Sequence, residues 1–193
     1  MTAPSYVHGS SDLALIGETI GAHFDRMAAR YAERDALIVR HQGVRWTYRE
    51  LAERVDALAA GLLALGLERG ERVGIWSPNN AEWVLTQFAT AKAGLILVNI
   101  NPAYRLAELE YALNKVGCAA LITASRFKTS DYLGMLRTLA PELGRAEPGR
   151  LQASRLPQLR LVINIGGESE SGMIRFEDVA TSHRVAVGSG DDQ

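Results

Sequence analysis

The chain has 193 residues, of which 47% are hydrophobic and 22% are charged, and its formal net charge is −1. This composition is typical of a globular domain of slightly more than average length that buries a substantial core. The near-zero net charge provides no basic field to attract nucleic acid or anionic lipid. Cys118 is the only cysteine, which excludes a disulfide framework and a thiolate metal cluster. We therefore expect a reducing, cytoplasmic setting.

The N-terminal residues "MTAPSYVHGSSD" are polar and lack the apolar core of a secretion signal. The longest apolar stretch, residues 57–67, has 11 residues, well short of the roughly 20 that span a bilayer. We expect a soluble protein without a transmembrane segment. In this prediction residues 1–12 and 181–193 are flexible tails, and residues 13–180 form the folded domain.

The first predicted elements are a helix and a hairpin. Apolar side chains at helical spacing predict a helix over residues 16–31. These side chains are Ile16, Ile20, Phe24, Met27 and Tyr31. Two β-branched stretches, residues 36–41 and 44–48, then predict strands joined by a two-residue turn at Gln42 and Gly43.

A capping box begins the next helix. Thr47 lies three residues before Glu50, a spacing at which each side chain can bond a backbone amide of the other residue. Apolar residues line one face of the helix that follows, and Gly66 supplies its end. These apolar residues are Leu51, Val55, Leu58, Leu62 and Leu65.

A strand-and-helix unit then occurs three times. The predicted strands are residues 72–77, 95–100 and 119–124, and the predicted helices are residues 80–93, 106–116 and 130–139. The strands are apolar without alternation, which is typical of parallel strands covered on both faces. A proline-containing surface excursion is expected over 141–157, one more strand over 159–167, and a short segment over 173–180. The fold class is therefore α/β, with a mostly parallel sheet and flanking helices.

Five polar residues and one proline lie at or just after the ends of two predicted strands. They are Ser77, Asn79, Asn80, Asn99, Asn101 and Pro102. Ligands of open parallel sheets bind beyond the carboxyl ends of the strands. However, Ser and Asn also cap helices and form turns, and Pro is favoured at the start of a helix. Capping and turn formation is the favoured interpretation for all six residues, and a ligand-binding role stays open.

No other motif indicates catalysis. The sequence has neither a phosphate-binding loop ending in lysine nor a G-x-G-x-x-G at a helix start, and "GSG" at residues 188–190 is interpreted as tail. The histidines are scattered without the spacing of metal ligands. They are His8, His23, His41 and His183. We expect Cys118 to be a small buried hydrophobe, and Asp191 and Asp192 to be solvated.

The spaced segments "TYREL", "GERVGIWSPNNAEW", "AKAGLILVNINPAYR" and "ELEYALNKVGCAALI" carry a resemblance. Together with "LPQLRLVINIGGE" and "GMIRFEDV", they resemble the N-terminal part of the adenylate-forming acyl-CoA synthetases over residues 14–180. "NINPAYR" and "KTSDY" are most similar to the medium-chain fatty acid–CoA ligases.

This resemblance implies an enzyme that activates a carboxylic acid with Mg-ATP, forms an acyl-adenylate and passes the acyl group to coenzyme A. In that family the phosphate loop, the acid-binding histidine, the ribose-binding aspartate and the catalytic lysine follow the matched region. We therefore assign no catalytic, cofactor-binding or metal-ligating residue here. We expect the 193-residue chain alone to bind no cofactor and to be inactive.

Two alternatives stay open. The chain could be a stand-alone binding or interaction module that keeps the scaffold without the chemistry. It could also be part of an adenylation enzyme that loads a carrier protein instead of coenzyme A. We further expect self-association, because a sheet that ends at the last predicted strand leaves an exposed edge.

Overall fold

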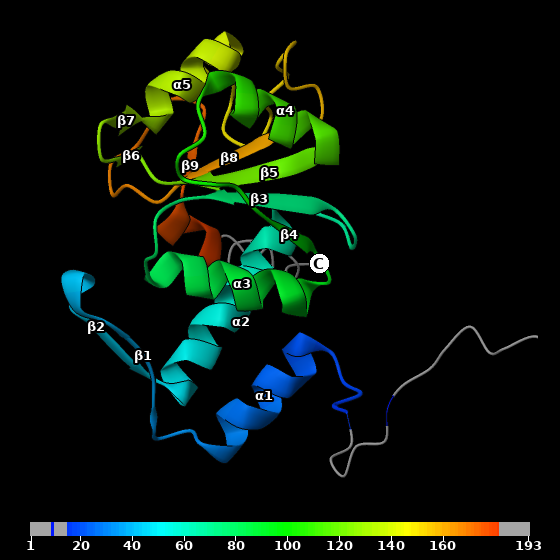
Figure 1. Cartoon of the computed structure of the whole chain (residues 1–193), viewed down its shortest axis with the longest axis vertical. Helices are drawn as coiled ribbons and strands as arrows, with labels where there is room; N and C mark the ends of the chain where they lie inside the picture. Colours follow the sequence, from blue (N-terminus) through cyan, green and yellow to red (C-terminus); the bar gives the residue numbers. More distant parts are fainter. Residues whose placement is uncertain (1–8, 10–14, 182–193) are drawn as a thin grey trace, which may run out of the picture.

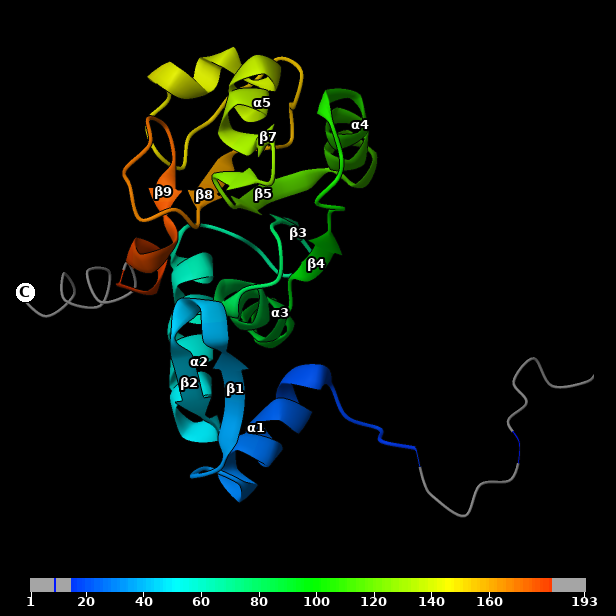
Figure 2. The same cartoon turned by 60° about the vertical axis from the view of Figure 1, so that its left-hand side comes forward.

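The computed structural model describes residues 9 and 15–181. Most of both predicted tails lies outside these residues, so the division into tails and domain stays a prediction. The described chain contains a five-stranded sheet between two helical layers (Figures 1 and 2). Helices α4 (Leu106–Val116) and α5 (Tyr132–Leu139) cover one face, and α2 (Tyr48–Ala64) and α3 (Ala81–Ala93) cover the other. The predicted α/β class is confirmed.

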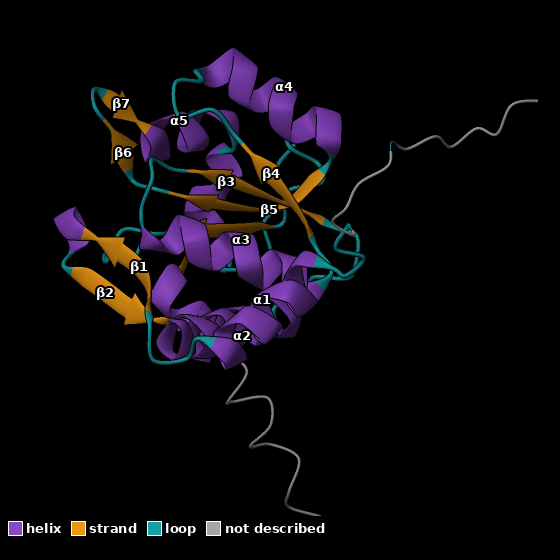
Figure 3. Cartoon of the chain, turned by 60° about the horizontal axis from the view of Figure 1, so that its bottom comes forward, coloured by secondary structure: helices purple, strands orange, loops and turns teal. Residues whose placement is uncertain are grey.

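The sheet has the strand order β4-β3-β5-β8-β9, and every neighbouring pair is parallel. Its strands are β3 (Arg72–Trp76), β4 (Ile96–Asn99), β5 (Cys118–Thr123), β8 (Leu161–Asn164) and β9 (Ile174–Arg175). Figure 3 shows the strands crossing between the helices. The predicted parallel sheet is confirmed, and the predicted helix over 106–116 has the bounds of α4.

Helix α1 (Ile20–Arg30) begins later than predicted because the Thr19 side chain accepts a hydrogen bond from the backbone N–H of Ala22. It packs outside α2 and α3 and buries Phe24. Two residues of the predicted apolar face are exposed: Ile20 of α1 at 59%, and Ile16, which precedes the helix, at 66%. The reason is that α1 lies against the helical layer rather than against the sheet, so only one narrow side of it is covered.

The hairpin strands β1 (Asp35–Val39) and β2 (Val44–Thr47) pair antiparallel. The predicted two-residue turn is wrong, because the pairing closes at Val39 and Val44. The chain reverses through the 3₁₀ turn η1 (Arg40–Gln42) and through Gly43, whose φ of 65° favours glycine.

The predicted capping box is confirmed at the start of α2. The Thr47 hydroxyl accepts a hydrogen bond from Glu50 N at 3.3 Å, and the Glu50 carboxylate accepts one from Thr47 N at 2.8 Å. Gly66, with a φ of 81°, follows the helix end and donates its N–H to the Leu63 carbonyl. Most of the predicted apolar face is buried: Leu51, Val55, Leu58 and Leu62.

The central strands β3, β5 and β8 lie between two hydrophobic clusters, one against each helical layer. By contrast, β4 lies at the edge of the sheet, and its Ile96 is 51% exposed. The prediction that every strand is covered on both faces is therefore wrong for β4. An edge strand has a neighbour on one side only, and the helices do not extend over it fully.

The predicted surface excursion over 141–157 is also wrong. The segment contains the 3₁₀ helix η2 (Pro141–Arg145), and its Leu143, Leu151 and Leu156 are buried in the cluster beneath α4 and α5. Prolines and glycines shape this segment without removing it from the core. Just before α5, an unpredicted two-stranded ribbon forms from β6 (Arg126–Phe127) and β7 (Ser130–Asp131), which delays the helix start to Tyr132.

After β9 the chain forms a helical segment over 176–181 that packs on α2 at Gly61. A Cβ atom on Gly61 would overlap the backbone carbonyl of Val179, a residue that is fully buried. Because Gly61 has no side chain, the backbone of residues 176–181 can pack directly against the backbone of α2.

We predict that Gly61→Ala destabilises the chain by about 1–3 kcal/mol, because the added methyl group must displace a buried backbone. At a helix position with free space, the same substitution would stabilise the folded chain, because glycine loses more conformational freedom on folding than alanine does. Urea denaturation followed by circular dichroism measures the difference. Gly144→Ala is the matched control, since a Cβ atom there meets nothing within 4 Å. Equal stabilities of Gly61→Ala and wild type would contradict the close approach.

Candidate functional site at the carboxyl edge of the sheet

Because β3, β4, β5 and β8 are parallel, their carboxyl ends meet at one edge of the sheet. We call this the carboxyl edge and define it by the segments that follow the four strands. These segments are residues 77–80, 100–104, 124–125 and 165–167. All six residues singled out from the sequence lie at the carboxyl edge or at the end of the strand before it.

After β3, the polar residues form a cap. Asn80 is the N-cap of α3: its side-chain oxygen accepts from Trp83 N at 2.8 Å, and its side-chain nitrogen donates to Ser77 Oγ at 2.8 Å. Ser77, which is 3% exposed, donates its hydroxyl to the Pro78 carbonyl. The favoured capping interpretation accounts for both side chains. Asn79 is exposed.

After β4, residues 100–104 form a turn. The Asn101 side-chain oxygen accepts from Ala103 N at 2.9 Å, and the Asn101 carbonyl accepts from Tyr104 N at 3.0 Å. This is the local hydrogen bonding by which asparagine stabilises turns. Asn99 and Asn101 are exposed, and Pro102 is partly buried.

Two buried aromatic side chains hold this turn from beneath. Trp76 Nε1 donates to the Asn101 carbonyl at 3.1 Å, and the Tyr132 hydroxyl donates to the Pro102 carbonyl at 2.5 Å. The two rings are stacked, with centroids 3.6 Å apart and planes 10° from parallel. Burial raises the pKa of Tyr132 to about 12, so its hydroxyl keeps the proton that it donates.

Sequence reasoning missed the polar residues after β5 and β8. Asn164 is 1% exposed, and its side-chain oxygen accepts from Gly166 N at 3.0 Å and from the Ser125 hydroxyl at 3.1 Å. A Cβ atom on Gly166 would overlap the Ser125 hydroxyl oxygen. The available signal was a polar residue that ends the apolar run "LVIN" before two glycines.

The carboxyl edge therefore carries neutral amides and hydroxyls that are engaged in caps and turns. Mg-ATP requires cationic clamps, a backbone cradle for phosphates and oxygen ligands for the metal. Within residues 9 and 15–181, no group of three or more His, Cys, Asp or Glu side chains could hold a metal ion. The side chains of the four segments that define the carboxyl edge are neutral, so they supply no cationic clamp for phosphates.

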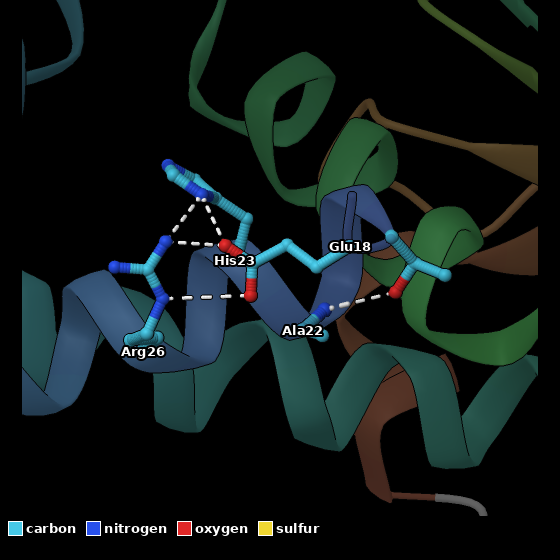
Figure 4. Close-up of polar contacts among 5 residues, drawn as sticks. Glu18, Ala22, His23 and Arg26 are labelled. Carbon is cyan, nitrogen blue, oxygen red and sulfur yellow. Dashed lines mark hydrogen bonds and ion pairs between the residues drawn. The ribbon is translucent and has the colours of Figure 1, made fainter. Parts of the chain in front are cut away.

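The two histidines that the structure describes, His23 and His41, lie on different elements. His23 Nδ1 lies 2.8 Å from the Glu18 carboxylate and 3.0 Å from an Arg26 nitrogen on the surface of α1 (Figure 4). The hydrogen bond from Arg26 and then that from His23 lower the pKa of Glu18 to about 2. His41 is exposed in the hairpin turn. His8 and His183 lie outside the described residues, as do residues 188–190, Asp191 and Asp192.

Cys118 begins β5 and is 1% exposed. Burial raises the pKa of its thiol to about 11, well above its ordinary value. A reactive cysteine needs a stabilised thiolate, so this environment suppresses nucleophilic chemistry. The interpretation of Cys118 as a small buried hydrophobe is confirmed.

Sequence comparison decides the family. The profile of the AMP-binding enzymes matches residues 24–183. The chain belongs to the AMP-binding enzyme family. The resemblance to adenylate-forming acyl-CoA synthetases is thereby confirmed.

Individual members of the family support this assignment. The chain is 46% identical over 176 residues to the medium-chain acyl-CoA ligase ACSF2, mitochondrial, of Bos taurus, and 49% identical over 175 residues to the protein of the same name in Danio rerio. Each match covers 91% of this chain and 29% of the relative, so the chain spans less than a third of these AMP-binding enzymes.

A solved structure shares the fold. The anthranilate CoA ligase AuaEII, in complex with anthranoyl-AMP, matches with a TM-score of 0.71 and 25% identity, covering 88% of this chain and 29% of that protein. Among the residues described here, every helix is too short or too polar to cross a lipid bilayer.

We predict that Asn80→Ala destabilises the chain by about 1 kcal/mol, because α3 loses its side-chain cap. Asn79→Ala is the matched control: it removes the same amide from an exposed neighbour and should change stability by less than about 0.5 kcal/mol. Thermal or urea unfolding of both variants measures the difference. Equal effects of the two substitutions would argue against the capping role of Asn80.

We also predict that Cys118 resists thiol reagents in the folded chain at about pH 8, where an unfolded thiol reacts readily. The raised pKa also links folding to pH. The protonated thiol favours the folded state, so this contribution is complete below the ordinary pKa of 9.0 and is lost as the pH rises toward about 11. Labelling with and without denaturant measures the reactivity. Equal labelling rates would contradict the buried environment.

Proposed function

We propose that the chain forms the N-terminal part of an ATP-dependent acid–CoA ligase that acts on medium-chain fatty acids. In the complete protein a carboxylate would attack the α-phosphate of ATP, forming an acyl-adenylate and releasing pyrophosphate. The thiol of coenzyme A would then take the acyl group, releasing AMP and forming a thioester. The observation that carries this proposal is the 46% identity to a medium-chain acyl-CoA ligase across 91% of the chain.

The contribution of this chain would be a rigid wall beside the reacting groups. Its parallel sheet presents caps and turns at the carboxyl edge, where open α/β sheets bind ligands. Adenylation also requires stabilisation of charge that develops at phosphorus. The neutral, internally bonded side chains of the carboxyl edge do not provide that stabilisation, so we infer that the 193-residue chain alone binds no Mg-ATP and is inactive.

Two further parts of the proposal concern the setting. We retain a cytoplasmic location, supported by a single buried cysteine, whereas the vertebrate relatives bear the word mitochondrial in their names. We also retain self-association through an exposed sheet edge. The last predicted strand, β8, is paired with β9, so the support comes from the opposite edge strand β4, whose Ile96 is half exposed. Sedimentation of wild type and Ile96→Lys at several concentrations tests the second idea, since a charge on the edge should disfavour pairing.

The stand-alone module and the carrier-loading enzyme remain the competing functions. Sequencing the source transcript beyond codon 193 in all three frames distinguishes a stand-alone module from a ligase. A downstream phosphate loop rich in glycine and threonine favours the ligase, and a stop codon without such a sequence favours the module. Transfer of the acyl group to coenzyme A or to a carrier protein separates the two enzymes.

We predict that the complete gene product converts octanoate, Mg-ATP and coenzyme A to octanoyl-CoA, AMP and pyrophosphate. The 193-residue chain should give only background in the same assay, because it lacks the phosphate cradle. Pyrophosphate release and chromatography of the thioester measure the two half-reactions. Turnover by the short chain would contradict the scaffold role. A complete product that adenylates none of a series of carboxylic acids would refute the ligase.

A further inference from the structure

The turn over residues 100–104 is held by groups from distant parts of the chain. Trp76 comes from the end of β3, and Tyr132 is the first residue of α5. Both side chains are fully buried, and each donates one hydrogen bond to a backbone carbonyl of the turn. The two accepting carbonyls, of Asn101 and Pro102, are consecutive. We call this arrangement the aromatic clamp.

The clamp does more than fill space. A phenylalanine at position 132 could occupy the same buried volume without a polar atom, and a buried hydroxyl is costly unless it has a partner. Pro102 has no N–H, so the turn cannot be anchored through that backbone donor. The carbonyl of Pro102 is the group that the turn offers to the interior, and Tyr132 reaches it at 2.5 Å.

The outer side of the same turn is polar and accessible. The side chains of Asn99 and Asn101 are exposed. On the inner side of the turn, the backbone carbonyls of Asn101 and Pro102 accept hydrogen bonds from Trp76 and Tyr132. The turn lies at the carboxyl edge, beside the cap formed by Ser77 and Asn80. A segment held on one side and accessible on the other is suited to present a fixed surface to a ligand.

We propose that Trp76 and Tyr132 are positioning residues that hold residues 100–104 as a fixed wall of the substrate-binding region in the complete ligase. This inference rests on the proposed function. Neither side chain contacts substrate in this arrangement. Each acts through the backbone carbonyl that it bonds, so the loss of one donor loosens the wall without changing the reacting groups.

The first experiment tests the clamp in the 193-residue chain. Tyr132→Phe keeps the stacked ring and removes only the donor. We expect the amides of Ala103 and Tyr104 to exchange with deuterium about five- to tenfold faster by NMR, as the loss of one hydrogen bond allows. The amide of Ile100, bonded to Ile75 in the sheet, should keep its rate.

The control variant is Tyr111→Phe, which removes the same hydroxyl from a ring that is 65% exposed on α4. Its exchange rates should equal those of wild type. The melting temperature of Tyr132→Phe should shift by no more than about 4 °C, in keeping with one hydrogen bond in a chain of this size. Uniformly faster exchange across the sheet would show a general folding role and would overturn the positioning role.

The second experiment uses the complete gene product, with the KM values of acid, ATP and coenzyme A measured separately. We expect Tyr132→Phe to raise at least one KM by about threefold or more while kcat stays within about twofold, and Tyr111→Phe to change neither. Unchanged KM values together with a loosened turn would overturn the inference and leave the ligase function intact. An inactive wild-type product would refute the ligase function, while the exchange experiment would still test the clamp.

Discussion

Burial of three parallel strands on both faces is the constraint on which the rest of this structure depends. Most residues of strands β3, β5 and β8 are apolar and buried, so each face of the sheet needs a helical cover. α4, α5 and residues 141–157 cover one face, and α2, α3 and the segment 176–181 cover the other. Gly61 is part of the same solution, because it lets the last described segment approach α2 closely.

The two ends of the sheet are stabilised in different ways. At the amino ends, charged side chains join segments that are distant in the sequence. Arg160, just before β8, pairs with Glu71, just before β3, at 2.7 Å, and Arg72 of β3 donates to the Val116 carbonyl at the end of α4. The Arg160 hydrogen bond lowers the pKa of Glu71. At the carboxyl edge the contacts are neutral, made by Asn80 and Asn164 and by the aromatic clamp. The ion pairs at the amino ends therefore hold segments of this chain together. The carboxyl edge carries no charged side chain of its own that would compete with charges of a substrate or of the rest of an AMP-binding enzyme.

This asymmetry supports the scaffold role proposed for the carboxyl edge. At the carboxyl edge, the side chains of Ser77, Asn80, Asn101 and Asn164 are hydrogen-bonded in caps and turns, while Asn79 is exposed. Rigid elements position a binding region more accurately than mobile loops do. In an AMP-binding enzyme about three times as long, such a wall would limit where the acid and the acceptor thiol can lie.

Local features of this protein could be predicted from its sequence because their partners are close in the chain. The Thr47 and Glu50 cap joins residues three apart, α4 was predicted with its observed bounds, and the parallel order of the strands follows from their spacing with helices. The spaced family motifs also identified the enzyme family, which the profile match to residues 24–183 confirmed.

Other features were decided only by the tertiary structure, because they depend on contacts between distant residues. Ser125 and Asn164 meet across 39 positions, and Tyr132 reaches Pro102 across 30. The exposure of Ile20 and the burial of Leu156 likewise depend on which layer each segment contacts. The spacing of apolar residues in the sequence indicates which side chains share one face of a helix or strand, but it does not specify which segment covers that face. Packing between layers decides that, and it also decides which polar groups at the carboxyl edge are already paired.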